Sequence, residues 1–169
     1  MRGAAFFTAM ALLVGACTTD PIPPGYRGPV AYIADSQAVR SSTGVDFFYI
    51  SRVNGNRVNN SLAATQSANA GRGFAMTPAM IGRPVPAETA TFTIVGRTHY
   101  AAPIIELVNK VYQVSGETKF TPLPNRAYVV KGILRDDYAA VWIEDGQTGE
   151  LAGNKIEIHG STTLGILEK

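Results

Sequence analysis

The sequence predicts a mainly β protein with little helix, folded as an antiparallel β-sandwich. Short runs rich in β-branched and aromatic residues recur along the chain, and Val45–Val53 is the strongest of them. Gly, Pro and Asn residues separate these runs, as turns between strands require. The run Thr91–Arg97 alternates, which places Phe92 and Ile94 on one face and threonines on the other. About eight such strands without long helical patterns are typical of a sandwich.

The first strands lie between residues 30 and 58. Val30–Ala34 is a short apolar run, and Val45–Val53 has the apolar centre of a buried strand. Asn54-Gly55 follows directly, and this dipeptide favours a type I′ turn because both central residues need positive φ. We therefore expect a hairpin over Val53–Val58.

The middle of the chain is less regular. Asn59–Arg72 is polar and rich in small residues, which fits either a long surface loop or one short helix over Ser61–Ala70. Two prolines within Arg83–Pro86 exclude a central strand there, because proline cannot donate to the hydrogen-bond ladder. Ile104–Val114 fits a helical stripe beginning after Pro103, yet most of its apolar residues are β-branched and its neighbours are strands. We expect a strand over this segment.

The last third of the chain predicts two strand pairs. Lys119–Thr121 leads through a proline-containing turn to Arg126–Leu134, and we expect these two strands to pair. Tyr138–Glu144 and Leu151–His159 flank the Gly-containing turn Asp145–Gly149, which indicates a hairpin.

One run in this part of the chain resembles a known kind of domain. Gly116 to Gly132 reads Gly-x-x-x-Phe-x-Pro-x-Pro-Asn-x-x-Tyr-x-Val-x-Gly, and it resembles the small prealbumin-like or immunoglobulin-like sandwich domains of proteobacterial lipoproteins. The resemblance implies a proline turn between two strands and a buried tyrosine at Tyr128. The resemblance covers the last third of the chain and implies no functional residue. We expect residues 30–169 to form a single sandwich domain.

The N-terminus has the pattern of a secretory signal. Arg2 is the only charge before an unbroken stretch of small and apolar residues from Gly3 to Ala16. This stretch is shorter than the roughly 20 apolar residues that a bilayer-spanning helix needs. We expect residues 1–16 to be a signal helix that is cleaved from the mature protein.

The end of that segment resembles the lipobox of bacterial lipoproteins, which has an aliphatic residue, two small residues and a cysteine. Here these are Val14, Gly15, Ala16 and Cys17, and Cys17 is the only cysteine of 169 residues. The resemblance implies that Cys17 receives a diacylglyceryl group, that cleavage before it makes it the first residue, and that its amino group is acylated with palmitate or a similar chain. Two or three acyl chains give stable anchoring. A solitary exported cysteine also has no partner for an intramolecular disulfide.

The residues after the cysteine predict a tether. Residues 17–29 contain four prolines and two glycines without periodicity, so they should hold the domain away from the membrane. If extended, they would reach roughly 35–40 Å at about 3.1 Å per residue. Thr18 is not the aspartate that retains such lipoproteins at the inner membrane. The family analogy therefore implies an outer-membrane location in a Gram-negative cell, and we expect the domain to face the periplasm.

Charge is divided unevenly along the chain. Residues 26–101 contain seven arginines, no lysine and three acids, whereas acids exceed bases in residues 102–169. One interpretation is that two faces of one domain carry different charged residues. The other is a cluster that contacts an anionic partner, such as lipid headgroups or a glycan. Its candidate contact residues are Arg52, Arg57, Arg72 and Arg97, with Arg83 as a further member. The sequence has no run of basic residues that would indicate binding to nucleic acid.

The sequence contains no convincing catalytic or metal-binding motif. His99 and His159 lie far apart and lack closely spaced ligand residues, so we expect no metal site and no cofactor. We expect a membrane-anchored binding or assembly module of the cell envelope, with its contacts on the Val53–Val58 hairpin and the loop 59–90. The alternative is an envelope hydrolase that acts on glycans or peptides through paired carboxylates such as Asp137 and Glu144.

Overall fold

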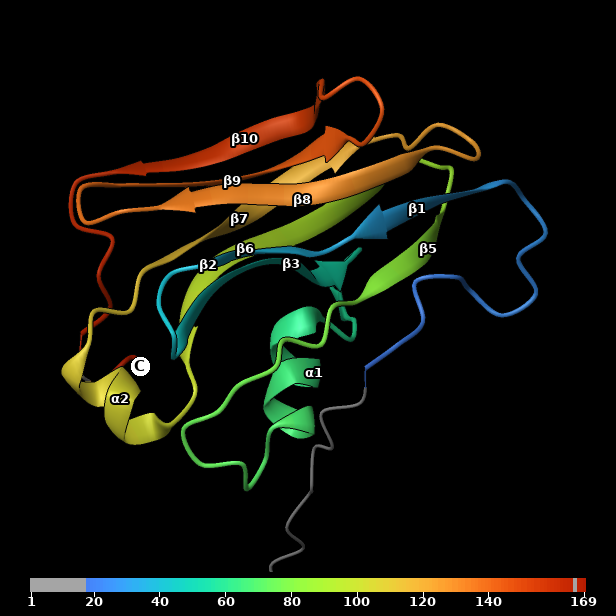
Figure 1. The fold of residues 1–169 in the computed structure, drawn as a ribbon. Helices are drawn as coiled ribbons and strands as arrows, with labels where there is room; N and C mark the ends of the chain where they lie inside the picture. The colour runs from blue at the N-terminus through green and yellow to red at the C-terminus, as the bar shows by residue number, and fades with distance from the viewer. Residues whose placement is uncertain (1–17, 166) are drawn as a thin grey trace, which may run out of the picture.

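The computed structural model describes residues 18–165 and 167–169, which form ten strands and two helices. The strands make two sheets of five (Figure 1). The first sheet has the order β10-β9-β8-β1-β5 and contains β1 (Val30–Ala34), β5 (Gly82–Pro86), β8 (Ala127–Leu134), β9 (Tyr138–Asp145) and β10 (Leu151–His159). The second has the order β2-β3-β6-β7, with β4 on β3, and contains β2 (Ser36–Val39), β3 (Gly44–Val53), β4 (Asn56–Arg57), β6 (Ala90–Tyr100) and β7 (Gln113–Phe120).

Strand pairing is mostly antiparallel. In the described part of the chain the exception is β1 with β8, which run parallel and join the N-terminal and C-terminal halves. This arrangement confirms the expected mainly β fold with two mostly antiparallel sheets.

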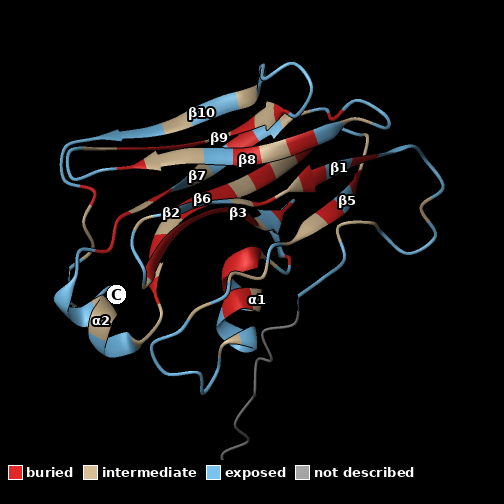
Figure 2. Ribbon diagram, viewed as in Figure 1, coloured by how far each residue is buried: buried red, intermediate tan, exposed pale blue. Residues whose placement is uncertain are grey.

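The main core lies between the two sheets. Side chains alternate across each strand, so Phe92 and Ile94 of β6 face the inward residues Val141 and Ile143 of β9, and all four are fully buried. Figure 2 shows the buried residues concentrated on β3, β6, β8 and β9. The inward direction predicted for Phe92 and Ile94 is confirmed.

The two predicted hairpins are present. Asn54 and Gly55 connect β3 to β4 with φ of 48° and 80°, as a type I′ turn requires. β9 pairs with β10 across the turn that contains Gly149, whose φ is 71°. The prediction that residues 83–86 do not form a central strand is also confirmed. β5 is an edge strand, so its prolines need not donate hydrogen bonds to a further strand.

The predicted pairing across the proline turn is wrong. β7 and β8 belong to different sheets, so residues 121–126 cross from one sheet to the other. The aromatic rings of Phe120 and Tyr128 meet at 5.3 Å between their sheets, and the Tyr128 hydroxyl accepts a hydrogen bond from the Leu123 amide at 3.0 Å. Tyr128 is buried, as the resemblance implied. Packing across the core, rather than strand pairing, therefore holds this connection.

The strand expected over residues 104–114 is also wrong for its first half. Helix α2 spans Pro103–Val108, and the chain becomes a strand only at Gln113. β6 is already paired with β3 and β7, so neither of its edges is free for another strand. Pro103 occupies the first turn of α2, where its missing N–H costs nothing.

Helix α1 spans Ser61–Ala68 and resolves the two alternatives left open for this region. Asn60 caps it, because its side chain accepts a hydrogen bond from the Ala63 amide at 3.0 Å. α1 covers the outer face of the second sheet, where Leu62 packs with Phe47 and Tyr49 of β3. The outer face of this sheet therefore carries a third layer (Figure 1).

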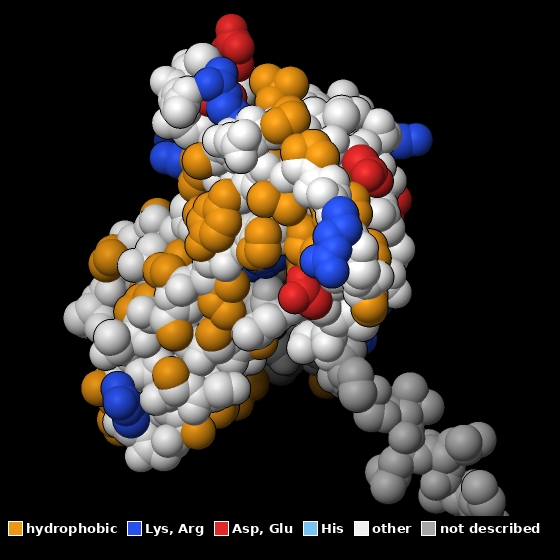
Figure 3. Space-filling model, turned by 90° about the vertical axis from the view of Figure 1, so that its right-hand side faces the viewer, with side chains coloured by type: hydrophobic (Ala, Val, Ile, Leu, Met, Phe, Trp, Pro, Cys, Tyr) orange, Lys and Arg blue, Asp and Glu red, His pale blue; other side chains and the backbone are white. Residues whose placement is uncertain are grey.

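The proline-rich segment does not extend away from the domain. Thr19 donates two hydrogen bonds to the Arg57 carbonyl, from its amide at 2.8 Å and its hydroxyl at 3.0 Å. The Tyr26 hydroxyl donates to the Pro29 carbonyl at 2.8 Å and closes the segment on itself. Figure 3 views the end of the molecule that this segment covers, and hydrophobic side chains gather at its centre. A spacer of 35–40 Å is thus excluded for residues 19–29.

Candidate functional site

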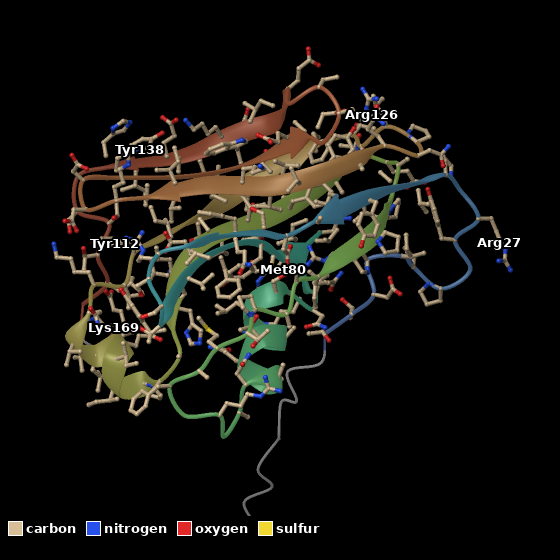
Figure 4. All side chains as sticks on the ribbon, in the orientation of Figure 1. Arg27, Met80, Tyr112, Arg126, Tyr138 and Lys169 are labelled. Atoms are coloured by element: carbon tan, nitrogen blue, oxygen red, sulfur yellow. The ribbon has the colours of Figure 1, made fainter. Side chains whose placement is uncertain are left out.

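A cleft of about 690 Å³ opens on the outer face of the second sheet. β6 forms its floor, α1 and the loop 69–76 form one wall, and α2 with the residues before it forms the other. Lys169 contributes to the rim, and Figure 4 shows it beside α2. Most of the lining is apolar, so the few polar side chains would orient whatever binds there.

Alternation along β6 turns Arg97 and His99 outward into the cleft. Both meet Glu106 of α2. His99 Nδ1 lies 3.0 Å from Glu106 Oε2, and Arg97 Nη2 lies 3.2 Å from Glu106 Oε1. Gln113 of β7 accepts a further bond from Arg97 at 2.7 Å. Helix α2 therefore covers the end of β6, and the Glu106 carboxylate connects the two by bonding both Arg97 and His99.

The pKa of Glu106 reflects this setting. Burial alone would raise the pKa, but the hydrogen bond and charge of His99, followed by those of Arg97, lower it below its ordinary value of 4.5. The side chain of Glu106 is therefore ionised near neutral pH. Because Glu106 contacts Nδ1 of His99, the other ring nitrogen, Nε2, is the one available to a ligand.

Side-chain hydrogen bonds hold the wall opposite α2. The Asn69 side chain donates to the carbonyls of Thr65 and Thr77 and accepts from the Thr77 amide, at 2.7 to 2.8 Å. The buried Thr65 hydroxyl accepts from the Ala79 amide at 2.9 Å. These bonds tie the loop 69–79 to α1, so the cleft has a fixed wall rather than a free loop.

The predicted arginine cluster is only partly assembled. Arg52 and Arg57 are directly opposed on β3 and β4, and both are exposed. Arg72 is exposed on the loop after α1, whereas Arg97 lies half-buried in the cleft. These four arginines therefore lie on the outer side of the second sheet, but they do not form one cluster.

Arg83 does not belong to any contact surface. It points inward from β5, is 5% exposed, and pairs with the buried Asp35 at 2.8 Å. Asp35 also accepts hydrogen bonds from the amides of Ile50 and Ser61 and from the Ser61 hydroxyl. Arg83 is therefore a structural residue that joins β5 to β3 and to the start of α1.

The paired carboxylates of the hydrolase alternative do not meet. Asp137 lies in the turn before β9, and Glu144 lies near the other end of that strand. The two residues are seven positions apart along an extended chain, which separates them by roughly 23 Å at about 3.3 Å per residue. A carboxylate pair for glycoside hydrolysis needs about 5–9.5 Å. This pair therefore cannot provide the catalytic carboxylates.

The residues Val14, Gly15, Ala16 and Cys17 lie outside the described part of the chain. None of the helices described has the length and apolar character needed to span a bilayer. Within residues 18–165 and 167–169, no group of three or more His, Cys, Asp or Glu side chains could hold a metal ion.

Sequence reasoning missed the cleft because its residues come from separate segments. The predicted strand ended at Arg97, whereas β6 continues to Tyr100 and so places His99 on the same face as Arg97. Glu106 belongs to a segment expected to be a strand, and Lys169 lies at the far end of the chain.

Comparisons with protein-family models, curated proteins and solved structures found no match for this chain. The fold and the cleft therefore define the protein only as a two-sheet β domain with a preformed cleft.

Proposed function

We propose that this protein is a lipid-anchored binding module of the Gram-negative cell envelope, attached to the outer membrane through Cys17 and facing the periplasm. The sequence supports the anchor through an apolar N-terminal segment that ends in Val14-Gly15-Ala16-Cys17. We further propose that the two facing sheets form a sandwich of the prealbumin-like or immunoglobulin-like kind.

The cleft is the observation that carries the binding function. Its mostly apolar walls suit an apolar ligand body, and His99 can bond a polar or acidic group on that ligand. Glu106 orients His99, as a hydrogen-bonded carboxylate does for a histidine that must present one defined nitrogen. Thr65, the one hydroxyl-bearing wall residue on α1, is already bonded to the backbone. The lining thus favours recognition over nucleophilic catalysis.

A fatty-acid probe tests binding. We expect a dansyl-labelled fatty acid to bind the lipidated full chain, and we expect His99→Ala to weaken that binding about tenfold, equivalent to about 1.4 kcal/mol. His159→Ala is the matched control, because His159 is exposed on β10 of the other sheet. Equal affinities for the wild type and both variants would contradict the assignment of the cleft.

A further inference from the structure

Helix α2 exposes an unusual amount of apolar surface. None of its six residues is buried, and Ile104, Leu107 and Val108 are 59%, 49% and 76% exposed. Across the cleft, Phe74 on the loop after α1 is 64% exposed. A scattered exposed apolar residue is ordinary, but several on two facing segments mark a contact surface.

This surface lies on the side where the described chain begins. α1, the loop after it and α2 all lie on the outer side of the second sheet, and the described chain also starts on that side (Figure 1). Thr19 is bonded to Arg57 of β4, a strand of the same sheet. Cys17 is two residues before Thr19, and two residues span at most about 7 Å. A lipid on Cys17 would therefore hold this side of the domain close to the bilayer.

Three exposed arginines lie on this side, together with two exposed acids, Asp20 next to Thr19 and Glu168 next to Lys169. The loop 69–76 contains Arg72 and no acid, and Glu106, the acid of α2, is turned toward Arg97 and His99. Arg52 and Arg57 are adjacent across the hairpin next to Thr19. Like charges directly opposed on a sheet destabilise it, and an anionic surface relieves that repulsion. Exposed Lys and Arg side chains are attracted to a surface of anionic lipid.

We propose that this side of the domain docks on the lipid bilayer. Phe74 and the exposed residues of α2 enter the headgroup region, as the apolar face of an interfacial helix does, to a depth of about 5–10 Å. Arg57 and Arg72 contact anionic headgroups. The proposal rests on the lipid anchor proposed above, since the short connection to Cys17 selects this side and makes the occupant a membrane rather than a second protein.

Introduced cysteines test the docking face with little background, because the acylated Cys17 has no free thiol. Full-length Phe74→Cys, Val108→Cys and Glu150→Cys proteins are produced with labelled palmitate, coupled to the fluorophore NBD, and placed in phosphatidylethanolamine and phosphatidylglycerol vesicles. Glu150 is an exposed control in the connection between β9 and β10 of the first sheet. We expect NBD at positions 74 and 108 to shift its emission to the blue and to lose intensity with nitroxide-labelled lipid, whereas NBD at position 150 does neither.

Two results would overturn the docking face while leaving the anchor intact. One is a palmitate-labelled, vesicle-bound protein whose NBD at 74 and 108 emits as in water. The other is a blue shift that lipid nitroxides do not quench and that fades as the protein is diluted in the membrane, which would show that a second copy covers the surface. A protein without palmitate would contradict the anchor, and with it the docking that rests on it.

Discussion

His99 and Glu106 are seven residues apart in the sequence and meet at 3.0 Å between Nδ1 and Oε2, at the floor of the cleft. His99 ends an outward-facing row on β6, and Glu106 projects back from α2. This contact, together with the Arg97 bond to the same carboxylate, fixes the short helix against the sheet. Glu106 therefore connects the wall that α2 forms to the floor of the cleft, while Lys169 Nζ donates to the Leu107 and Asn109 carbonyls at 3.2 and 2.6 Å.

Glu106→Gln should loosen α2. The variant keeps the shape of the side chain but removes the charge that holds Arg97 and His99, which should lower the free energy of unfolding by about 1.5–3 kcal/mol. Urea denaturation measures this change in the free energy of unfolding. Glu157→Gln is the control, because Glu157 forms an exposed pair with Lys155 on the first sheet and should change little. Equal losses in both variants would contradict a special role for Glu106.

Acid should weaken the same contact. The pKa of Glu106 is lowered in the folded protein, so its ionised form stabilises the fold above the ordinary value of 4.5. That contribution is lost as the pH falls below 4.5 and through the lowered pKa. Unfolding midpoints of the wild type and Glu106→Gln should therefore converge on acidification. A difference that stays constant with pH would show that the charge of Glu106 does not stabilise the fold.

Removing Arg83 should be far more costly than removing an exposed arginine. Arg83→Met leaves Asp35 as a buried charge without its salt-bridge partner, which should cost about 3–5 kcal/mol. Arg57→Met should change stability by less than about 0.5 kcal/mol. The double variant Asp35→Asn with Arg83→Met should lose less than the sum of the two single changes. Additive losses would mean that the two residues act independently.

Gly132→Ala should disturb the main core. A Cβ at this position of β8 would overlap the Phe48 ring and lie 2.6 Å from the Ala140 carbonyl oxygen. We expect a loss of about 1–3 kcal/mol in thermal or urea unfolding. Gly165→Ala is the control, because the nearest atom to its Cβ would be a Glu168 carboxylate oxygen at 3.4 Å. A stable Gly132→Ala protein would contradict the close packing of the two sheets.

Local signals in the sequence predicted much of the fold. Asn54-Gly55 needs positive φ at both residues, and the Thr91–Arg97 alternation defines an inner and an outer face without reference to the rest of the chain. Helix α2 was missed because the β-branched residues of Ile104–Val108 suggest a strand. The β preference of these residues did not produce a strand, because both edges of β6 were already paired.

Long-range relationships could not be read in the same way. The apolar pattern shows that β7 and β8 are strands, but not that they belong to different sheets. Arg83 and Arg97 look alike in the sequence, yet one faces a buried Asp35 and the other an open cleft. The partner of a charged side chain is decided by tertiary packing, so the cleft became apparent only in three dimensions.

Intact mass spectrometry of the mature protein, purified from membranes, tests the proposed lipid anchor at Cys17. We expect a chain that begins at Cys17 and carries the added mass of a diacylglyceryl group with an N-linked acyl chain, and we expect Cys17→Ser to abolish this species. A mature protein that begins at another residue, or that begins at Cys17 without added lipid mass, would contradict the proposed anchor.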